Sequence, residues 1–290
     1  MGSPARTELG TLSRMLWTFT GHVDGLPDGV EHWLRTDPAR NTVPLTVLGR
    51  MRAGLWADGA TLGWLTADGE VCGAVVHTPP YPLLLADIPV DSVPALADAV
   101  RGREISAVSG PCPQAEVFAE VSGLTEVDRT RQRLYRLQAL SPASSTGAPR
   151  PAGEADVEPV AAWMRAFIAE AEPGSSGSDP LPQMRHRIDQ GEIVLWEDGG
   201  RPVAMAGFSR PISGMSRIGP VYTPPGLRGR GYGSAVTHAA TRAAQEAGGE
   251  VILLFTDLSN PTSNSIYQAL GYRPLSDYIS ISFSPGDQRA

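Results

Sequence analysis

The 290-residue chain contains no lysine, and all 24 of its basic residues are arginine. This absence excludes reactions that need a lysine amine, such as Schiff-base formation, and it excludes a phosphate loop of the Gly-Lys-Ser/Thr type. The 31 acidic residues give a net charge of −7. A chain of this charge has no overall field for a polyphosphate strand, so we expect no general nucleic-acid binding.

Cysteine and long apolar runs are also scarce. Cys72 and Cys112 are the only cysteines, and neither lies in a Cys-x-x-Cys pair or beside a histidine. The sequence therefore predicts no disulfide framework, no zinc or thiol-redox motif and no other metal site. No run of about 18 apolar residues is present, and residues 1–14 lack the apolar core of a secretory signal. We expect a cytoplasmic protein without a membrane partner.

The length is sufficient for two domains of roughly 150 residues each. Apolar periodicity stops at residues 141–153 (SPASSTGAPRPAG), where proline, glycine, serine and alanine dominate. This composition is typical of a flexible linker. We therefore expect one domain over residues 1–140, a linker over 141–153 and a second domain over 154–290.

The second half is predicted to run helix, helix, three antiparallel strands, helix, strand, helix and strand. Its clearest hairpin joins residues 193–197 to 202–209 through an Asp-Gly-Gly turn, and residues 251–255 are a continuous apolar run typical of a buried strand. The first half repeats much of this plan. It has a meander over residues 61–88, a helix over 93–100, a strand over 105–108 and a helix over 117–124, with residues 134–140 as its expected closing strand. The pattern suggests an ancient duplication.

The two halves differ in the loop that follows the third strand of each meander. The second half has the sequence Arg228, Gly229, Arg230, Gly231, Tyr232, Gly233, Ser234, which opens directly into a predicted helix. Glycines allow close approach and positive φ, and a helix start presents free N–H groups and a positive dipole end. The first half has two acids and a proline over residues 87–91. We therefore expect an anion site suited to a pyrophosphate in the second half alone.

Two motifs in the second half resemble those of the GNAT superfamily of N-acetyltransferases. Arg228-x-x-Gly231-x-Gly233 looks like its acyl-CoA-binding motif, and the stretch from Asp257 to Tyr272 resembles its signature N-x-x-[AS]-x-x-x-Y-x-x-x-G-[FY]. The resemblance covers residues 154–284, and the first half resembles a degenerate copy, as in tandem members of the superfamily. It implies an α/β (α+β) fold class with two GNAT-like domains, each a mixed, mainly antiparallel sheet flanked by helices.

The resemblance also implies roles for particular residues. The loop from Arg228 to Ser234 would bind the pyrophosphate of acetyl-CoA or another acyl-CoA. The backbone of Val221, Tyr222 and Thr223 would pair with the pantetheine arm, with Asn260 and Ser263 of the second motif on its other side. Tyr267 lies where members of the superfamily keep a tyrosine near the CoA sulfur, where it would act as general acid to the leaving thiolate.

The general base is less clearly indicated. Asp257, at the end of a buried strand, is the candidate that would act through water, and Glu197 is a weaker one. Asp257 and Tyr267 each have an alternative structural role. Asp257 would cap a helix or order a loop, and Tyr267 would serve only as an aromatic side chain in the packing. Three further acids, Glu170, Glu172 and Asp179, lie in the segment expected to build the acceptor site and would attract a cationic amine.

The leading hypothesis is an enzyme that transfers an acyl group from acyl-CoA to a primary amine of a small molecule, with the N-terminal half shaping the acceptor pocket. In a second hypothesis the acyl donor is a carrier protein or an aminoacyl-tRNA. Such a donor would bind to a basic stripe formed by Arg129, Arg131, Arg133 and Arg136. The stripe alternatively forms a solvated strand edge. The third hypothesis is a non-catalytic acyl-CoA-binding module.

Overall fold

The computed structural model describes residues 15–56, 58–171 and 179–285. The meander predicted in the N-terminal half is present, and two helices that the sequence patterns did not predict precede it. The elements of this half are β1 (Met15–Thr20), α1 (Asp28–Leu34), α2 (Thr42–Arg52), β2 (Thr61–Ala67), β3 (Glu70–His77), β4 (Leu83–Leu85), α3 (Val93–Ala99), β5 (Ala107–Pro111), α4 (Cys112–Val121) and β6 (Glu126–Leu137).

The C-terminal half follows the predicted order of helices and strands, with one additional strand before it. Its elements are β7 (Ala148–Pro151), α5 (Val157–Ala171), α6 (Leu181–Asp189), β8 (Ile193–Asp198), β9 (Arg201–Phe208), β10 (Met215–Tyr222), α7 (Tyr232–Glu246), β11 (Val251–Asp257), α8 (Pro261–Ala269) and β12 (Tyr272–Phe283). The extra strand β7 lies inside the expected linker and pairs with β8. No helix in the described part of the chain is long and apolar enough to cross a membrane.

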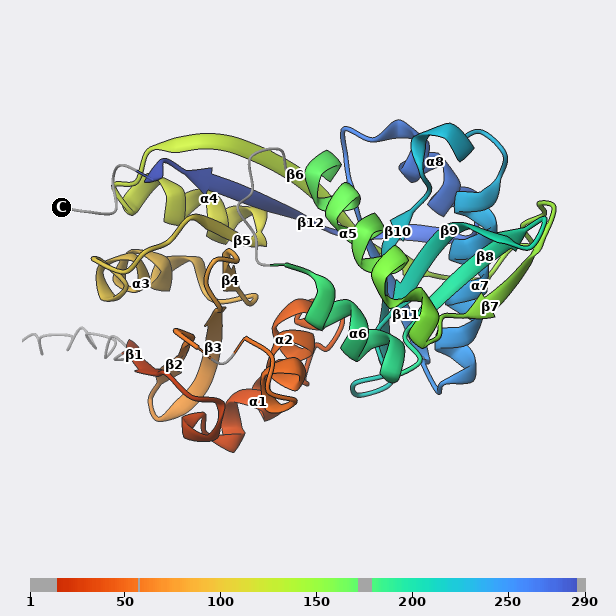
Figure 1. Ribbon diagram of the computed structural model, residues 1–290. Coiled ribbons are helices and arrows are strands. Elements are labelled where there is room, and N and C mark those ends of the chain that lie inside the picture. Colours follow the sequence, from red (N-terminus) through yellow and green to blue (C-terminus); the bar gives the residue numbers. More distant parts are fainter. Residues whose placement is uncertain (1–14, 57, 172–178, 286–290) are drawn as a thin grey trace, which may run out of the picture.

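The twelve strands found among the described residues form one sheet, in the order β1-β2-β3-β4-β5-β12-β6-β11-β10-β9-β8-β7 (Figure 1). Most neighbouring strands are antiparallel, and β4–β5 and β10–β11 are parallel. Helices flank the sheet, so the fold is the mixed, mainly antiparallel one that was expected.

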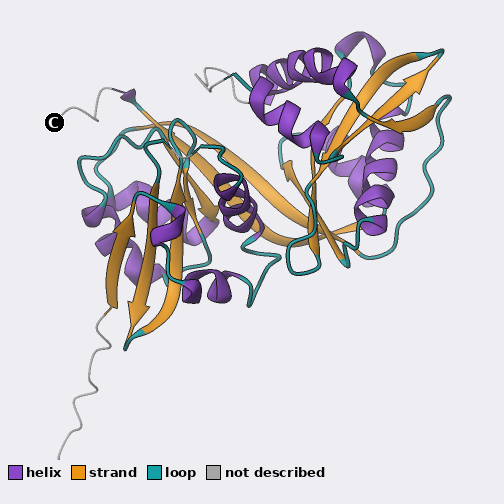
Figure 2. Ribbon diagram, turned by 60° about the horizontal axis from the view of Figure 1, so that its bottom comes forward, coloured by secondary structure: helices purple, strands orange, loops and turns teal. Residues whose placement is uncertain are grey.

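The two halves exchange their last strands. β6, which was expected to close the first half, pairs with β11 of the second half, and β12 pairs with β5 of the first half. The expectation that each half closes its own sheet is therefore wrong. The reason is length, because β6 and β12 have 12 residues each and pair with one another from Tyr272↔Leu137 to Phe283↔Glu126. Figure 2 shows this long ribbon bridging the two groups of strands.

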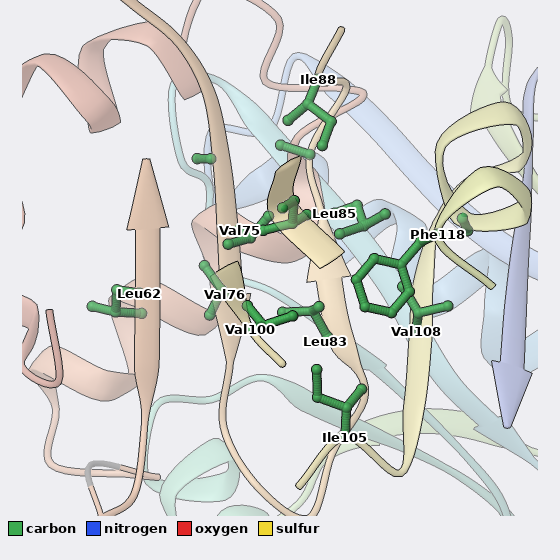
Figure 3. Packing of buried hydrophobic residues seen from close by; sticks show 14 of the residues in the cluster. Leu62, Val75, Val76, Leu83, Leu85, Ile88, Val100, Ile105, Val108 and Phe118 are labelled. Atoms are coloured by element: carbon green, nitrogen blue, oxygen red, sulfur yellow. The ribbon is translucent and has the colours of Figure 1, made fainter. Parts of the chain in front are cut away.

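The exchange extends to the hydrophobic cores. The N-terminal core packs strand residues such as Leu62, Val75 and Val108 against Phe118 of α4 (Figure 3), and Ile279 and Ile281 of β12 belong to the same cluster. In the other direction, Tyr135 of β6 is part of the core beneath α7. Each half thus buries apolar side chains from a strand of the other half, which ties the folding of the two halves together.

Candidate active site

Strands β10 and β11 separate part of the way along their length. They pair in parallel from Met215↔Val251 to Ile218↔Leu254, but β10 continues to Tyr222 and β11 to Asp257 without further pairing between them. A register irregularity between Ile218 and Val221 marks the point of divergence on the other side of β10, where that strand pairs with β9. The backbone of residues 219–222 therefore faces a gap in the sheet, where an extended ligand can pair with it.

The glycine-rich loop lies directly after this unpaired stretch. Gly229 and Gly231 have φ of +79° and +82°, a conformation that favours glycine, and Gly231 is the N-cap of α7. The first intrahelical hydrogen bond runs from the Ala235 N–H to the Gly231 carbonyl, so the N–H groups of residues 232–234 precede it and have no intrahelical acceptor. Together with the dipole of this 15-residue helix, they fit an anionic phosphate.

Gly233 brings the start of α7 close to two other elements. A Cβ at this position would lie 3.6 Å from Thr223 Oγ1, just beyond β10, and 4.0 Å from Ile266 Cδ1 on α8. The loop, the end of β10 and the helix that carries Tyr267 therefore meet at one place.

Residues 144–146 of the expected linker brace this loop. The Ser145 hydroxyl donates to the Arg230 carbonyl at 2.9 Å, and the Thr146 hydroxyl donates to Asp198 Oδ2 at 2.8 Å. The Tyr232 hydroxyl also donates to Asp198, and these hydrogen bonds hold the pKa of the Asp198 carboxyl below its usual value. Thus Tyr232 anchors the helix start to the β8–β9 turn, with its side chain buried.

The Arg228 side chain packs against the protein and makes its polar contacts with protein groups. Its guanidinium donates to the Thr223 carbonyl at 2.9 Å and to Glu170 Oε2 at 2.6 Å, and it lies over the Tyr222 ring. The Tyr222 hydroxyl donates to the other oxygen of Glu170 at 3.3 Å. Consequently Glu170, which was expected to attract an amine, is engaged with the loop. Asp179 is likewise engaged with Arg165, and Glu172 lies outside the described residues.

The second motif forms the start of α8. The Asn260 side chain accepts a hydrogen bond from the Ser263 N–H at 3.0 Å and caps the helix. Tyr267 is 8% exposed, and its ring packs edge-on against Tyr272 with centroids 6.3 Å apart. Burial raises the pKa of Tyr267 to about 12, against the opposing effect of a hydrogen bond with Ser263. Its hydroxyl therefore keeps its proton at neutral pH.

The two candidate bases have different surroundings. Asp257 ends β11 and accepts a hydrogen bond from the Ser259 N–H at 2.7 Å, which orders the turn before α8. Glu197 lies on β8 and accepts from Arg150 Nε at 2.7 Å, next to the edge strand β7. Asp257 thus borders the gap between β10 and β11, whereas Glu197 is engaged in an ion pair on the far side of β9.

A cavity of about 200 Å³ opens beside the diverging part of β10. Its lining residues come from both halves of the chain, and they are Arg50, Met164, Phe167, Gln183, Arg187, Ser209, Arg217, Gly219 and Pro220. The sequence patterns identified none of its three arginines as site residues, because no motif contains them. A larger hollow of about 460 Å³ lies in the N-terminal half around residues 21–24 and 51–54, and no residue of the loop or of α8 lines it.

The basic stripe on β6 is largely neutralised. Arg129 forms ion pairs with Glu116 and Glu126, and Arg131 also contacts Glu116. Arg133 makes two hydrogen bonds to Asp277 of β12, at 2.6 and 2.8 Å. These pairs leave little positive charge for a carrier protein or tRNA.

Comparison with known proteins places the diverging strands and the loop within one family match. Residues 160–272, from α5 to the first residue of β12, match the acetyltransferase (GNAT) family. A mycothiol acetyltransferase from Beutenbergia cavernae is 27% identical over an alignment of 193 positions, and the alignment covers 57% of this chain and 62% of that protein. The matched region thus spans less than two thirds of the length of this relative.

Similar folds occur among solved structures. A Drosophila protein of 14% identity has a TM-score of 0.62, over 91% of this chain and 96% of that one. A tandem GNAT protein from the clavulanic acid biosynthesis pathway has 10% identity and a TM-score of 0.59, over 94% of this chain and 99% of that one. At these identities the likeness concerns the fold, which extends over nearly the whole chain.

Proposed function

We propose that this chain, whose residues 160–272 form a domain of the acetyltransferase (GNAT) family, transfers an acetyl group from acetyl-CoA to the primary amine of a small molecule. The observation that carries the proposal is the divergence of β10 from β11 directly before the start of α7. An unpaired strand edge followed by free helix N–H groups suits a ligand that has an extended amide-containing arm and a phosphate.

Acetyl-CoA supplies an acetyl thioester, whose carbonyl the amine attacks and whose thiolate leaves. In our proposal the N–H groups of residues 232–234 hold the pyrophosphate, and the backbone of residues 221–223 pairs with the pantetheine arm. Arg228 contributes by fixing the loop against Glu170 and Thr223. Asn260 and Ser263 form the opposite wall, at the start of α8.

Two side chains move protons in this scheme. Tyr267 remains protonated at neutral pH, so it can donate its proton to the leaving thiolate. Asp257, at the end of β11, takes the proton of the attacking amine through water. In this proposal the N-terminal half also helps to form the acceptor site. The supporting observation is that Arg50 of α2 lines the cavity next to β10.

Calorimetric titration with acetyl-CoA tests the donor site, using Gly231→Asp as the variant. A side chain at φ +82° strains the loop, and its carboxylate would repel the pyrophosphate. We expect the wild-type protein to bind acetyl-CoA. The variant should lose at least about 100-fold in affinity, because it weakens the hydrogen bonds from the loop to the pyrophosphate and adds repulsion between two negative charges.

Gly226→Ala is the matched control, because a Cβ there meets no atom within 4 Å and φ is not positive. Its affinity is expected to equal that of the wild type. Release of CoA thiol with a panel of primary amines then measures transfer. Folded wild-type protein that fails to bind acetyl-CoA would contradict the proposal, and binding without transfer to any amine would favour a non-catalytic module.

A further inference from the structure

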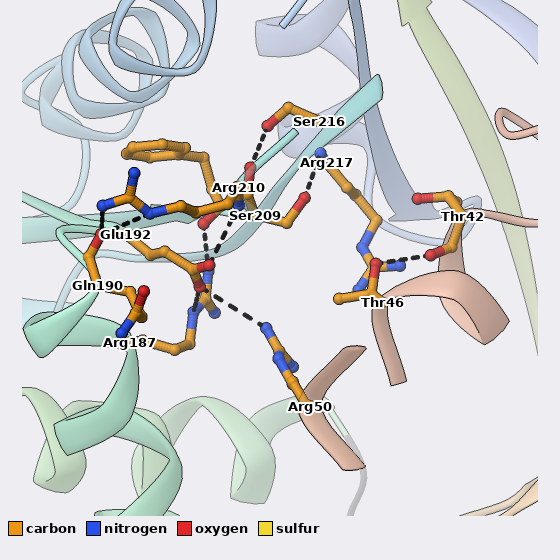
Figure 4. A network of polar contacts seen from close by, with 11 residues as sticks. Thr42, Thr46, Arg50, Arg187, Gln190, Glu192, Ser209, Arg210, Ser216 and Arg217 are labelled. Carbon is orange, nitrogen blue, oxygen red and sulfur yellow. Dashed lines mark hydrogen bonds and ion pairs between the residues drawn. The ribbon is translucent and has the colours of Figure 1, made fainter. Parts of the chain in front are cut away.

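Three arginines converge on the cavity beside β10, and they come from distant parts of the chain. Arg50 belongs to α2, Arg187 to α6 and Arg217 to β10, and all three line the cavity (Figure 4). Arg187 is 3% exposed and the side chain of Arg50 is 13% exposed. Arg217 is half-buried, but its Nη1 atom is fully covered and has no hydrogen-bond partner.

The carboxylate available to these arginines is Glu192. Its Oε2 lies 3.2 Å from Arg187 Nε and 4.0 Å from Arg50 Nη2, while its Oε1 accepts the Arg210 N–H. Of the described residues that line the cavity, none is acidic. Three guanidinium groups therefore share one carboxylate, which leaves a local excess of two positive charges.

The arginines also repel one another. Burial, together with the charges of Arg50 and Arg187, lowers the pKa of Arg217 to about 9. Burial and Arg50 likewise lower the pKa of Arg187 to about 10. Both values are well above neutral pH, so the groups stay charged. A buried excess of charge is costly unless a counter-ion compensates it.

The position of Arg187 is determined by the backbone around it. Its Nη2 donates to the Phe208 carbonyl at 3.1 Å, and a Cβ at Gly207 would lie 2.4 Å from the same nitrogen. The absence of a side chain at position 207 thus makes room for the guanidinium over β9. An arginine held in this way is preorganised for a ligand rather than free to turn toward solvent.

We propose that this cavity binds a carboxylate of the acceptor, so that the substrate is an amine that also carries a carboxylate, as amino acids do. The inference rests on the proposed function. Gly219 and Pro220 line the cavity and belong to the diverging stretch of β10, so a carboxylate held by the arginines would leave the amine beside that strand. Met164 and Phe167 provide an apolar wall for the carbon chain between the two groups.

This assignment reverses the expectation from sequence that acidic residues attract a cationic amine. Glu170 and Asp179 are bound to arginines outside the cavity, and the cavity itself is basic. A carboxylate in the cavity would balance the excess charge of the three arginines.

The test uses acetyl-CoA and a panel of amino acids, each paired with its carboxamide, and measures kcat/KM by CoA thiol release. We expect the acids to exceed their amides by about ten- to hundredfold, the range of a charge-assisted hydrogen bond. Arg50→Gln removes one of the three charges and relieves repulsion, so the variant should fold, and it should lose most of that preference. Arg217→Gln is the second variant, with the same expected loss.

Arg242→Gln is the control, because this arginine lies on the solvent face of α7 in an exposed pair with Glu246, and the preference should persist. Equal turnover of acids and amides would overturn the inference and leave the proposed function intact. Failure to bind acetyl-CoA would count against the proposed function instead. If no amine reacts, calorimetry measures the affinity for N-acetyl amino acids and for their amides. Tighter binding of the acids supports the inference, and equal or weaker binding of the acids overturns it.

A second experiment varies the acyl donor, because the carboxylate that the arginines bind could belong to the acyl group instead of the acceptor. Succinyl-CoA carries one on its acyl group, and acetyl-CoA does not. A preference for succinyl-CoA of tenfold or more that disappears in Arg50→Gln would assign the arginines to the acyl group and overturn the acceptor assignment. Equal or better use of acetyl-CoA supports the acceptor assignment.

Discussion

At the scale of single residues, Tyr267 is the side chain whose chemistry depends most on its surroundings. It lies next to Tyr272, and burial raises the pKa of its hydroxyl to about 12, so the hydroxyl keeps its proton at neutral pH. A proton donor to a thiolate must hold its proton in the working range, and Tyr267 meets this condition without a charged partner.

We therefore predict that Tyr267→Phe lowers kcat by about 100-fold, the lower range for loss of a general acid. Affinity for acetyl-CoA should change little, because the ring and its packing remain. Because burial raises the pKa of Tyr267 to about 12, its protonation does not change between pH 6 and pH 9, and the loss should be the same over this range. A pH series of initial rates measures it.

Tyr272→Phe is the matched control for this experiment. Its hydroxyl is hydrogen-bonded to Thr241 at 2.6 Å within the core, so its removal affects packing rather than the reaction. An unchanged kcat in Tyr267→Phe would assign Tyr267 to packing and refute its role as proton donor.

Single residues of the proposed donor site could be named from the sequence because the spacing within each motif is local. The glycines of the loop lie within one short segment, and Asn260 to Tyr267 lie within another, so each set forms a motif that can be recognised from the sequence. The arginine cluster is different, because Arg50 and Arg187 belong to different halves of the chain and no periodicity connects them. Tertiary folding alone brings them to one cavity.

At the scale of secondary-structure elements, the ribbon of β6 and β12 holds the two halves together. Arg133 and Asp277 form a bidentate ion pair across it, and this pair holds the pKa of the Asp277 carboxyl below its usual value. The carboxylate side chain is 45% exposed, so solvent screens the interaction and its contribution is at most about 1 kcal/mol.

We predict that Asp277→Asn lowers the free energy of unfolding by about 0.5–1 kcal/mol at pH 7. A lowered carboxyl pKa stabilises the folded state above the unfolded pKa of about 3.9, and this stabilisation disappears as the pH falls through the folded value. The difference between wild type and variant should therefore shrink below about pH 4 in denaturant titrations.

The comparison variant is Asp98→Asn, which breaks a highly exposed pair between Asp98 of α3 and Arg101, just beyond that helix. It should show no measurable difference at any pH. A difference for Asp277→Asn that stays constant from pH 7 to pH 3 would show that the pair does not act through charge.

Most elements could be predicted from local patterns, but the pairing of β6 and β12 could not. The alternation of side chains indicates that a segment is a strand, and it carries no information on which strand lies beside it. Residues 134–140 were expected to close the first half because they follow it in sequence, yet β6 pairs with β11. Helices α1 and α2 were not predicted from the sequence. α1 has only seven residues, and α2 buries seven of its eleven, so neither has a broad polar face.

At the scale of the whole molecule, the exchanged strands make the two halves interdependent. A fragment of residues 154–290 would lack β6 and leave the edge of β11 unpaired, and its β12 would have no β5. We predict that this fragment does not fold and is recovered insoluble, because it exposes apolar strand edges.

The matched experiment cuts the chain between Pro142 and Ala143 and co-expresses residues 1–142 with residues 143–290. Every strand pair then remains available between the two fragments, so they should co-purify and bind acetyl-CoA as the intact chain does. A soluble, monomeric 154–290 fragment with bound acetyl-CoA would refute this prediction and show that the C-terminal half is autonomous.

The place of β12 in the sheet also has a consequence for synthesis on the ribosome. β5 ends at Pro111, and its partner β12 begins at Tyr272, 161 residues later. At a typical rate of 5–20 residues per second, the nascent N-terminal half waits roughly 10 to 30 s for the strand that completes its sheet. During that time the edge of β5 and the core that Ile279 and Ile281 complete stay uncovered, so final folding of both halves begins only after β12 has been synthesised.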